Sequence, residues 1–165
     1  AIMIMFMMTS SLLAESDTKG IEKDEMVVLA QSINKRFFLM KEVAAFKQKK
    51  NMPSFVPGRE HLILATAKSI GDTYSLDASS IQGFVDTILR VSVDVQNSWR
   101  RHWIKEGFDY ADQIRDLENQ IRPELYELTI NIVSQTAKIY PIIHDPKKHS
   151  ELKRILDEQL NAEYV

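Results

Sequence analysis

Apolar residues recur at helical spacing along most of the chain, and the breaks between these stretches separate its elements. The first long helix is predicted over residues 23–50, and a loop with two prolines and one glycine follows between Pro53 and Gly58. A second helix is predicted over residues 59–70, with Gly71 directly after its C-terminus. Because no stretch shows the strict alternation of a strand, the pattern predicts an all-α fold.

The next stretch predicts a third long helix and a polar segment behind it. Asp77 is of the type that caps a helix N-terminus, and Gly107 is expected to end this helix. The segment 109–120 is polar and is predicted to be helical. Pro123 then either interrupts this helical stretch or starts the next helix.

The remaining residues predict two more helices. One runs to about Tyr140 and is expected to end at Pro141, and the last opens at Asp145–Pro146, an N-cap followed by proline at the first helical position. With 165 residues, the chain is expected to form one domain, a bundle of about five to six helices with a long N-terminal helix.

Two cations interrupt the apolar stripe of the predicted first helix. At about 100° per residue, Arg36 and Lys47 fall within the same arc as Met40. Desolvating an unpaired charge costs on the order of several kcal/mol, so an anionic partner is expected to meet them. For Lys47 the alternative is that its stem is buried while its head reaches water near the helix C-terminus.

Further polar groups occupy stripe positions or helix starts elsewhere in the chain. Ser92 and Gln96 are four residues apart and project from one helix face, Arg59–Glu60 opens the second helix, and Arg122 lies beside a proline. Each has an ordinary alternative, such as a serine bonded to a carbonyl one turn back or an arginine paired with a neighbouring glutamate. Together they suit a small ligand that carries two carboxylates and a neutral oxygen.

The composition narrows the chemistry further. The formal net charge is −2 and no long basic run occurs, which argues against nucleic acid as a partner. The chain has no cysteine, and its four histidines show no metal-ligand spacing, so neither thiolate catalysis nor a metal site is expected. The five glycines are isolated and form no phosphate-binding loop. No cofactor is predicted.

The N-terminus has the form of an export signal. Ile2–Met8 is a continuous apolar run, and small residues follow up to Ala14. Residues 1–14 are therefore interpreted as a signal-peptide remnant and residues 15–165 as the folded domain, exported to the periplasm or secreted. The run is too short to span a bilayer, so no stable membrane association is expected. The alternative is an N-terminal helix segment buried in the domain.

The motifs of residues 25–103 resemble those of the all-helical chorismate mutases. The residues that carry the resemblance are SINKRFFLMKEVAAFK at 32–47, Pro53, GRE at 58–60, and LRVSVDVQNSW at 89–99. The C-terminal helical extension, residues 109–165 with IRPEL at 121–125, and the apparent export signal are similar to the exported subclass.

The resemblance implies an isomerase of aromatic amino acid biosynthesis that converts chorismate to prephenate by an intramolecular [3,3] rearrangement, without cofactor or metal. It implies that Lys47 and Gln96 donate hydrogen bonds to the ether oxygen on which negative charge develops. The substrate-binding roles it implies are carboxylate contacts for Arg36 and Arg122, assisted by Ser92, pocket shaping for Arg59, and hydroxyl recognition for Glu60. Members of the family tend to form homodimers.

Some positions leave the assignment open. Val56 stands in the loop where members of the family commonly carry an acidic residue. Arg115 competes with Arg122 for the role of completing the pocket, because it has a similar sequence context. The alternative functions are an isochorismate pyruvate lyase, a catalytically silent helical module that binds a dicarboxylate, and a helical bundle without a ligand.

Overall fold

The computed structural model describes residues 2–110, 113–143 and 145–160, with side chains from Lys23 onward. Within these ranges the chain is helical and contains no strand, which confirms the all-α, single-domain fold. In chain order the elements are α1 (Ile2–Lys49), α2 (Pro57–Thr73), α3 (Ala78–Glu106), the π-helical turn η1 (Leu117–Ile121), α4 (Arg122–Lys138), α5 (Tyr140–Ile143), the 3₁₀ turn η2 (Pro146–Lys148) and α6 (His149–Gln159).

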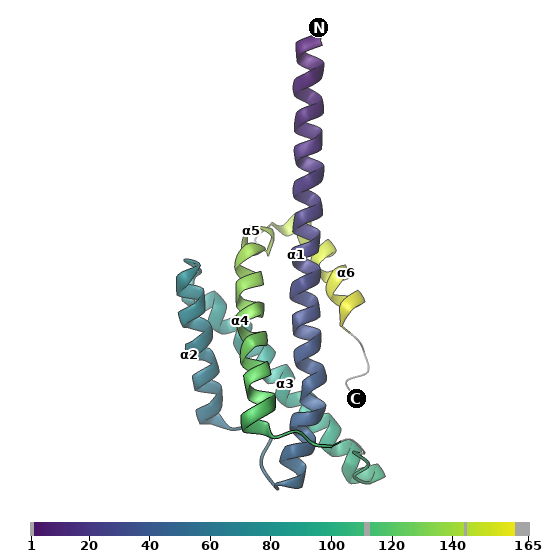
Figure 1. The fold of residues 1–165 in the computed structure, drawn as a ribbon, viewed down its shortest axis with the longest axis vertical. Coiled ribbons are helices and arrows are strands. Elements are labelled where there is room, and N and C mark those ends of the chain that lie inside the picture. The colour runs from purple at the N-terminus through teal and green to yellow at the C-terminus, as the bar shows by residue number, and fades with distance from the viewer. Residues whose placement is uncertain (1, 111–112, 144, 161–165) are drawn as a thin grey trace.

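Helix α1 is the axis of the bundle. Its C-terminal half packs against α3, α4 and α6, while its N-terminal half projects beyond the other helices as a single rod (Figure 1). Helix α2 packs on α3 and α4, and in Figure 1 it lies on the far side of α4 from α1. Helices α3 and α4 therefore both contact α1 on one side and α2 on the other.

The apolar core changes in character along α1. At the end nearer the rod, Met26, Leu29 and Ala30 are buried against Ile132 and Ile155, which close a continuous apolar cluster. Towards the C-terminus of α1 the apolar cluster is smaller and polar side chains become buried beside it. The largest apolar cluster therefore lies at one end of the bundle, and towards the other end smaller clusters alternate with buried polar groups.

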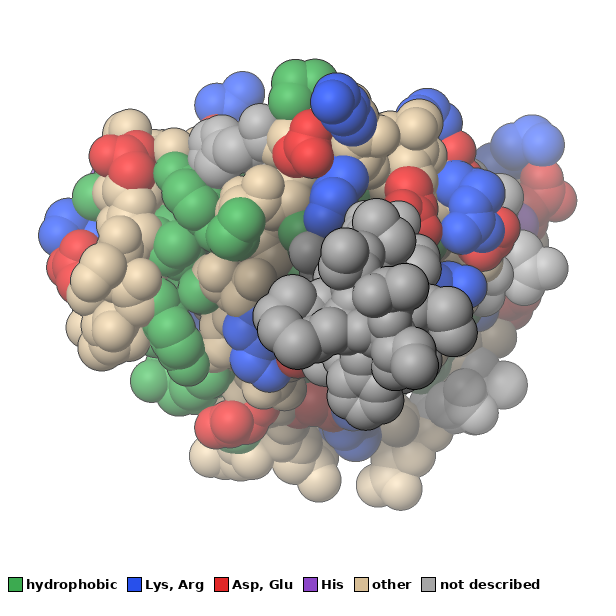
Figure 2. Space-filling view, turned by 90° about the horizontal axis from the view of Figure 1, so that it is seen from above, with side chains coloured by type: hydrophobic (Ala, Val, Ile, Leu, Met, Phe, Trp, Pro, Cys, Tyr) green, Lys and Arg blue, Asp and Glu red, His purple; other side chains and the backbone are tan. Residues whose placement is uncertain are grey.

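The surface is mixed in charge. Figure 2 looks at the bundle from above, and on this face basic and acidic side chains are interspersed with apolar ones around the grey atoms. Within the described part of the chain, no helix combines the length and the apolarity that crossing a membrane requires.

The first two helices differ from their predicted bounds. Helix α1 is described from Ile2 to Lys49, so the apolar N-terminal run belongs to the same continuous helix, which contains no proline. Gly71 was predicted to lie beyond α2 and instead lies inside it. A Cβ at Gly71 would lie 3.3 Å from Ile81 Cγ1, so this glycine allows α2 to approach α3 closely.

The segment after α3 was predicted to be helical from 109 to 120, and this was wrong for most of it. Of its described residues, only those of η1 from Leu117 onward are helical. Helix α4 also ends earlier than predicted, at Lys138, and Pro141 lies within the short helix α5 instead of ending α4. The polar segment lacks an apolar stripe that would select a helix, so tertiary contacts decide its path.

The two caps predicted for α3 are confirmed, whereas Gly71 does not cap α2. Asp77 accepts a hydrogen bond from Ser80 N at the start of α3, and Gly107 ends α3 with φ of 95°. Asp145 was predicted to cap the last helix, but it caps the 3₁₀ turn η2 by accepting from Lys147 N, and α6 begins after this turn at His149. Pro123 lies in the first turn of α4, where its missing N–H costs no helical hydrogen bond.

Candidate active site

A cavity of about 290 Å³ lies between α1, α2, α3 and α4. Helix α1 contributes the positions i, i+4, i+7 and i+11 of one face, and helices α2, α3 and α4, with the loop before α2 and the turn η1, close the remaining sides. All seven residues predicted for the site line this cavity: Arg36, Lys47, Arg59, Glu60, Ser92, Gln96 and Arg122. The structure thus brings together side chains from four helices, while their individual roles stay predictions.

Lys47 is buried at the wall of the cavity, with a side chain that is 7% exposed. Its Nζ donates to the Ser54 carbonyl at 2.6 Å and to Gln96 Oε1 at 3.0 Å. Both acceptors are neutral, and among the described residues no carboxylate pairs with this ammonium group. The alternative in which the head of Lys47 reaches water is therefore wrong.

The surroundings of Lys47 disfavour its charge. Burial, together with the charges of Arg122 and Arg100, lowers the pKa of Lys47 to about 8, and the charge of Glu60 opposes this shift. A buried ammonium group without a carboxylate partner would be stabilised by an anion bound in the cavity.

Gln96 and Ser92 are buried side by side on α3. Gln96 Oε1 accepts from Lys47, and its Nε2 donates to the Ser92 carbonyl at 3.1 Å and lies 3.4 Å from Met40 Sδ. The Ser92 hydroxyl donates to the Ile88 carbonyl one turn back, which is the common arrangement of a serine within a helix. One donor position of Gln96 is thus occupied only by a weak sulfur acceptor.

Arg36 is 3% exposed and has no carboxylate partner among the described residues. Its Nη1 donates at 3.3 Å to both the Leu125 carbonyl and Thr129 Oγ1, and its buried Nε has no hydrogen-bond partner. Burial, assisted by the charge of Arg59, lowers the pKa of Arg36 to about 10, so the guanidinium is charged at neutral pH. The expected anionic partner of the two stripe cations is therefore not a side chain of the described residues.

Arg59, Glu60 and Arg122 line the rest of the cavity and are half-buried. Burial lowers the pKa of Arg59, and the charge of Arg122 adds to this effect. Burial raises the pKa of Glu60, which is the one acidic residue of the lining, while Lys47 opposes that shift. Arg122 pairs with Glu118 one turn before it in the chain.

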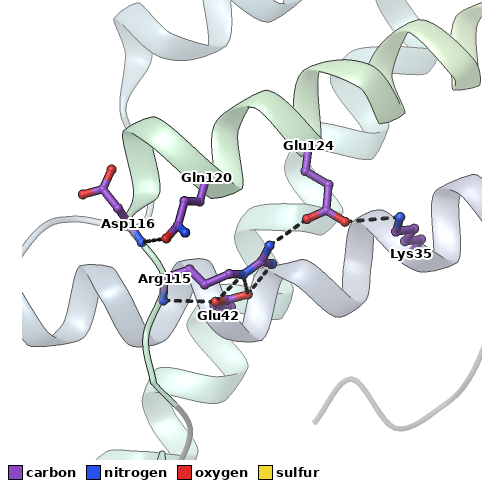
Figure 3. A network of polar contacts seen from close by, with 6 residues as sticks. All are labelled: Lys35, Glu42, Arg115, Asp116, Gln120 and Glu124. Atoms are coloured by element: carbon purple, nitrogen blue, oxygen red, sulfur yellow. Dashed lines mark hydrogen bonds and ion pairs between the residues drawn. The ribbon is translucent and has the colours of Figure 1, made fainter.

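Arg115 lies outside the cavity and is held in a network of its own (Figure 3). Its Nη2 donates to Glu42 Oε2 on α1 at 2.6 Å, and its Nη1 donates to Glu124 Oε2 on α4 at 3.0 Å. Lys35 of α1 pairs with the other Glu124 oxygen at 3.2 Å. The hydrogen bonds to Glu42 and Glu124 raise the pKa of Arg115. Of the two rival arginines, only Arg122 therefore faces the cavity.

Several residues of the site were not predicted from the sequence. Ser54 lines the cavity from the loop before α2, beside Val56, which the sequence had already indicated, and Thr129 and the half-exposed Tyr126 line it from α4. Thr129 lies on the same helix face as Arg122, so helical spacing carried a signal for it. Ser54 carried none, because a loop serine has no periodicity.

The lining is cationic overall. It has four cations and one carboxylate, all supplied by residues that the sequence analysis singled out. The cations come from α1, α2 and α4 on different sides of the cavity, which suits a compact ligand with two separated carboxylates. No group of three or more His, Asp or Glu side chains among the described residues is placed to hold a metal ion.

Two sequence comparisons point to the chorismate mutases, and a comparison of structures shows a shared fold. Residues 27–97 match the family model described as chorismate mutase type II. A monofunctional chorismate mutase of Enterobacter agglomerans is 26% identical over 110 residues, which are 67% of this chain and 60% of that relative. The chain thus spans less than two thirds of the curated relative's length.

Two crystal structures titled chorismate mutase share the fold. The one from Burkholderia thailandensis has a TM-score of 0.76 at 23% identity and covers 81% of this chain and 84% of its own. The one from Burkholderia phymatum has a TM-score of 0.76 at 21% identity, over 87% of this chain and 90% of its own. Across residues 27–97, this chain therefore carries the sequence pattern of the chorismate mutase type II family, within a fold shared with solved chorismate mutases.

Proposed function

We propose that this protein is a chorismate mutase that converts chorismate to prephenate. One observation carries the proposal. The buried ammonium group of Lys47 has no carboxylate partner among the described residues and donates to the Gln96 amide at the wall of a cationic cavity. Chorismate is a dicarboxylate with an ether oxygen between its two parts. The rearrangement breaks a carbon–oxygen bond and forms a carbon–carbon bond within one molecule, and it transfers no proton.

The arginines bind the substrate in its reactive conformation. Arg36 and Arg122 approach the cavity from α1 and from the start of α4, so each is placed to receive one carboxylate. Holding both carboxylates selects the folded conformer in which the two reacting carbons meet, and this removes part of the entropic barrier. Glu118, which pairs with Arg122 here, is exposed and can yield Arg122 to a substrate carboxylate.

Lys47 and Gln96 stabilise the transition state. As the carbon–oxygen bond breaks, negative charge grows on the ether oxygen, and donors placed beforehand at that atom lower the barrier. The Gln96 Nε2 donor that now faces Met40 Sδ is available to the ether oxygen, and Lys47 Nζ retains a third donor beyond its two neutral acceptors. Recognition of the ring hydroxyl falls to Glu60, since Val56 contributes only apolar surface.

The direct test is to add chorismate to the protein, follow its ultraviolet absorbance and identify prephenate as the product. Saturable turnover to prephenate supports the proposal. Salicylate and pyruvate formed from isochorismate, with no prephenate from chorismate, would make the protein an isochorismate pyruvate lyase. Saturable binding of chorismate without any product would make it a binding module.

Substitution of Arg122 and of Arg115 distinguishes the two rival arginines. We expect Arg122→Ala to raise KM for chorismate by roughly 10- to 100-fold, because a charge-assisted contact is lost from the cavity. Arg115→Ala is expected to lower the melting temperature instead, since it breaks the pairs with Glu42 and Glu124. Steady-state kinetics and thermal melts of both variants check this, and inactivity of Arg115→Ala at full stability would contradict it.

The pH dependence should report the ionisation of Lys47. Its pKa lies near 8, so kcat/KM is expected to fall above pH 8 by about tenfold per pH unit, because only the ammonium form donates to the ether oxygen. Between pH 8 and the ordinary value of 10.5 the unfolded chain binds more protons at Lys47 than the native chain does. Lys47 therefore makes the native state more stable as pH rises in this window, and the loss cannot arise from its effect on folding.

We also propose that the protein is exported and forms a homodimer. The apolar run Ile2–Met8 before Ala14 supports export, and the tendency of the resembled family supports the dimer. Cell fractionation with mass spectrometry of the N-terminus tests export, and an uncut cytosolic chain would contradict it. Sedimentation tests the dimer, and a monomer at micromolar concentration would contradict that part.

A further inference from the structure

Arg100 fastens the loop that leads from α1 to α2. It lies on α3 one turn beyond Gln96, so the two side chains share a face of that helix. Its Nε donates to Gln48 Oε1 at 2.9 Å, and its Nη1 donates to the Met52 carbonyl at 2.9 Å and to Ser54 Oγ at 3.1 Å. One guanidinium thus binds the end of α1 and two residues of the loop at once.

The same loop carries an acceptor of Lys47. Ser54 is buried although it lies in a loop, and its carbonyl accepts from Lys47 Nζ at 2.6 Å. Met52 N donates to the Lys47 carbonyl at 2.8 Å, which ties the loop back to α1. The position of Lys47 Nζ therefore depends on where the Ser54 backbone is held, and Arg100 is the side chain that binds Ser54 from α3.

We propose that Arg100 is a positioning residue for the reaction: by clamping the loop through Gln48, Met52 and Ser54, it holds the Ser54 carbonyl where it aims Lys47 Nζ into the cavity. The inference rests on the proposed chorismate mutase activity. Arg100 itself does not line the cavity, so it acts through Lys47 and not on the substrate.

The chemistry of this contact requires an arginine. The three acceptors are neutral oxygens at different places, and the planar guanidinium presents donors in a fixed fork that reaches all of them. Lysine keeps the charge but presents one ammonium group, so it cannot maintain the three contacts together. Arg100→Lys therefore keeps the positive charge but loses the three simultaneous hydrogen bonds, so it tests the hydrogen bonds alone.

The test compares Arg100→Lys with Arg101→Lys in the full chain. Arg101 is the next residue on α3, is exposed and donates to Ser98 Oγ on its own helix, so it is a matched control. We expect Arg100→Lys to lose roughly 10- to 100-fold in kcat, with KM changed by less than about threefold, because the catalytic cation is misplaced while the carboxylate contacts remain. The control is expected to keep both constants.

A second readout does not need turnover. Amide hydrogen exchange of residues 50–56 is expected to be about tenfold faster in Arg100→Lys than in the parent and unchanged in Arg101→Lys. Gln48→Ala removes one of the three contacts and should give a smaller loss of kcat. This variant tests the clamp even if Arg100→Lys fails to fold. A parent without turnover but with the expected exchange would refute the proposed function and leave the clamp in place. Turnover and exchange of Arg100→Lys equal to those of the parent would overturn the clamp.

Discussion

Replacing Lys47 by methionine is expected to abolish nearly all turnover while the fold is retained. Methionine fills a similar volume but donates no hydrogen bond, so the ether oxygen loses its charged partner in the transition state. Loss of one such donor costs about 10²- to 10³-fold in kcat, and the charge on Lys47 places the expected loss at the upper end or beyond. Steady-state kinetics with chorismate measures it.

The same substitution makes a second, separate measurement informative. Lys47→Met removes an unpaired buried charge, which favours folding, but leaves the Ser54 carbonyl and Gln96 Oε1 without their donor, which opposes it. We expect these effects to offset each other, with the melting temperature within about 4 °C of the parent value. Lys49→Met, two residues away and exposed, is the control and should keep full activity. A collapse of helix content in Lys47→Met would mean that this lysine is structural.

Replacing Arg36 by methionine is the second large effect that we expect. Arg36 is buried, charged and without a carboxylate partner among the described residues, so its pairing capacity is left for a ligand anion. Removing one partner of a buried charge pair costs about 2–5 kcal/mol, which corresponds to a fall in kcat/KM of roughly 30- to several-thousand-fold. The loss should fall mainly on KM, since the carboxylate is bound in both the ground and transition states.

The stability of Arg36→Met should move in the opposite direction to its activity. The native protein buries the Arg36 guanidinium with Nε unsatisfied, and methionine removes both that orphan donor and the desolvated charge. We therefore expect an equal or higher melting temperature, measured against Arg90→Met, where the arginine is exposed on α3 and paired with Asp86. An unstable Arg36→Met would show that the hydrogen bonds to Leu125 and Thr129 outweigh the desolvation of the charge.

Helical periodicity was sufficient to predict the part of the site that lies on regular helices. Arg36 and Lys47 fall on a core-facing arc, and their burial follows from the angle per residue alone. Ser92 was found in the same way, whereas Gln96 lies at the edge of its stripe, and its position four residues after Ser92 pointed to it. These residues are local to one helix face, so no knowledge of the partner helices was needed.

The loop before α2 and the polar segment after α3 could not be predicted in this way, because their structures depend on contacts with distant residues. The role of Ser54 depends on a contact with Arg100, 46 residues away in the chain, and no local pattern reports such a contact. Residues 109–120 were predicted to be helical, yet residues 113–116 are not, and Arg115 holds this part of the chain on α1 through Glu42. Nothing in a single sequence distinguishes this arginine from a solvated one on a helix.

The geometry of the site depends on the number of residues in the π-helical turn η1. The N–H of Arg122 bonds to the Leu117 carbonyl five residues back, so this turn holds one residue more than an α-helical turn would. Helix α4 is held by its buried face, so deletion of one residue here would rotate the preceding chain by about 100° relative to it. Leu117 would then leave the cavity wall and Arg115 would turn away from Glu42. In the divergence of such proteins, this turn should accept substitutions more readily than changes in length.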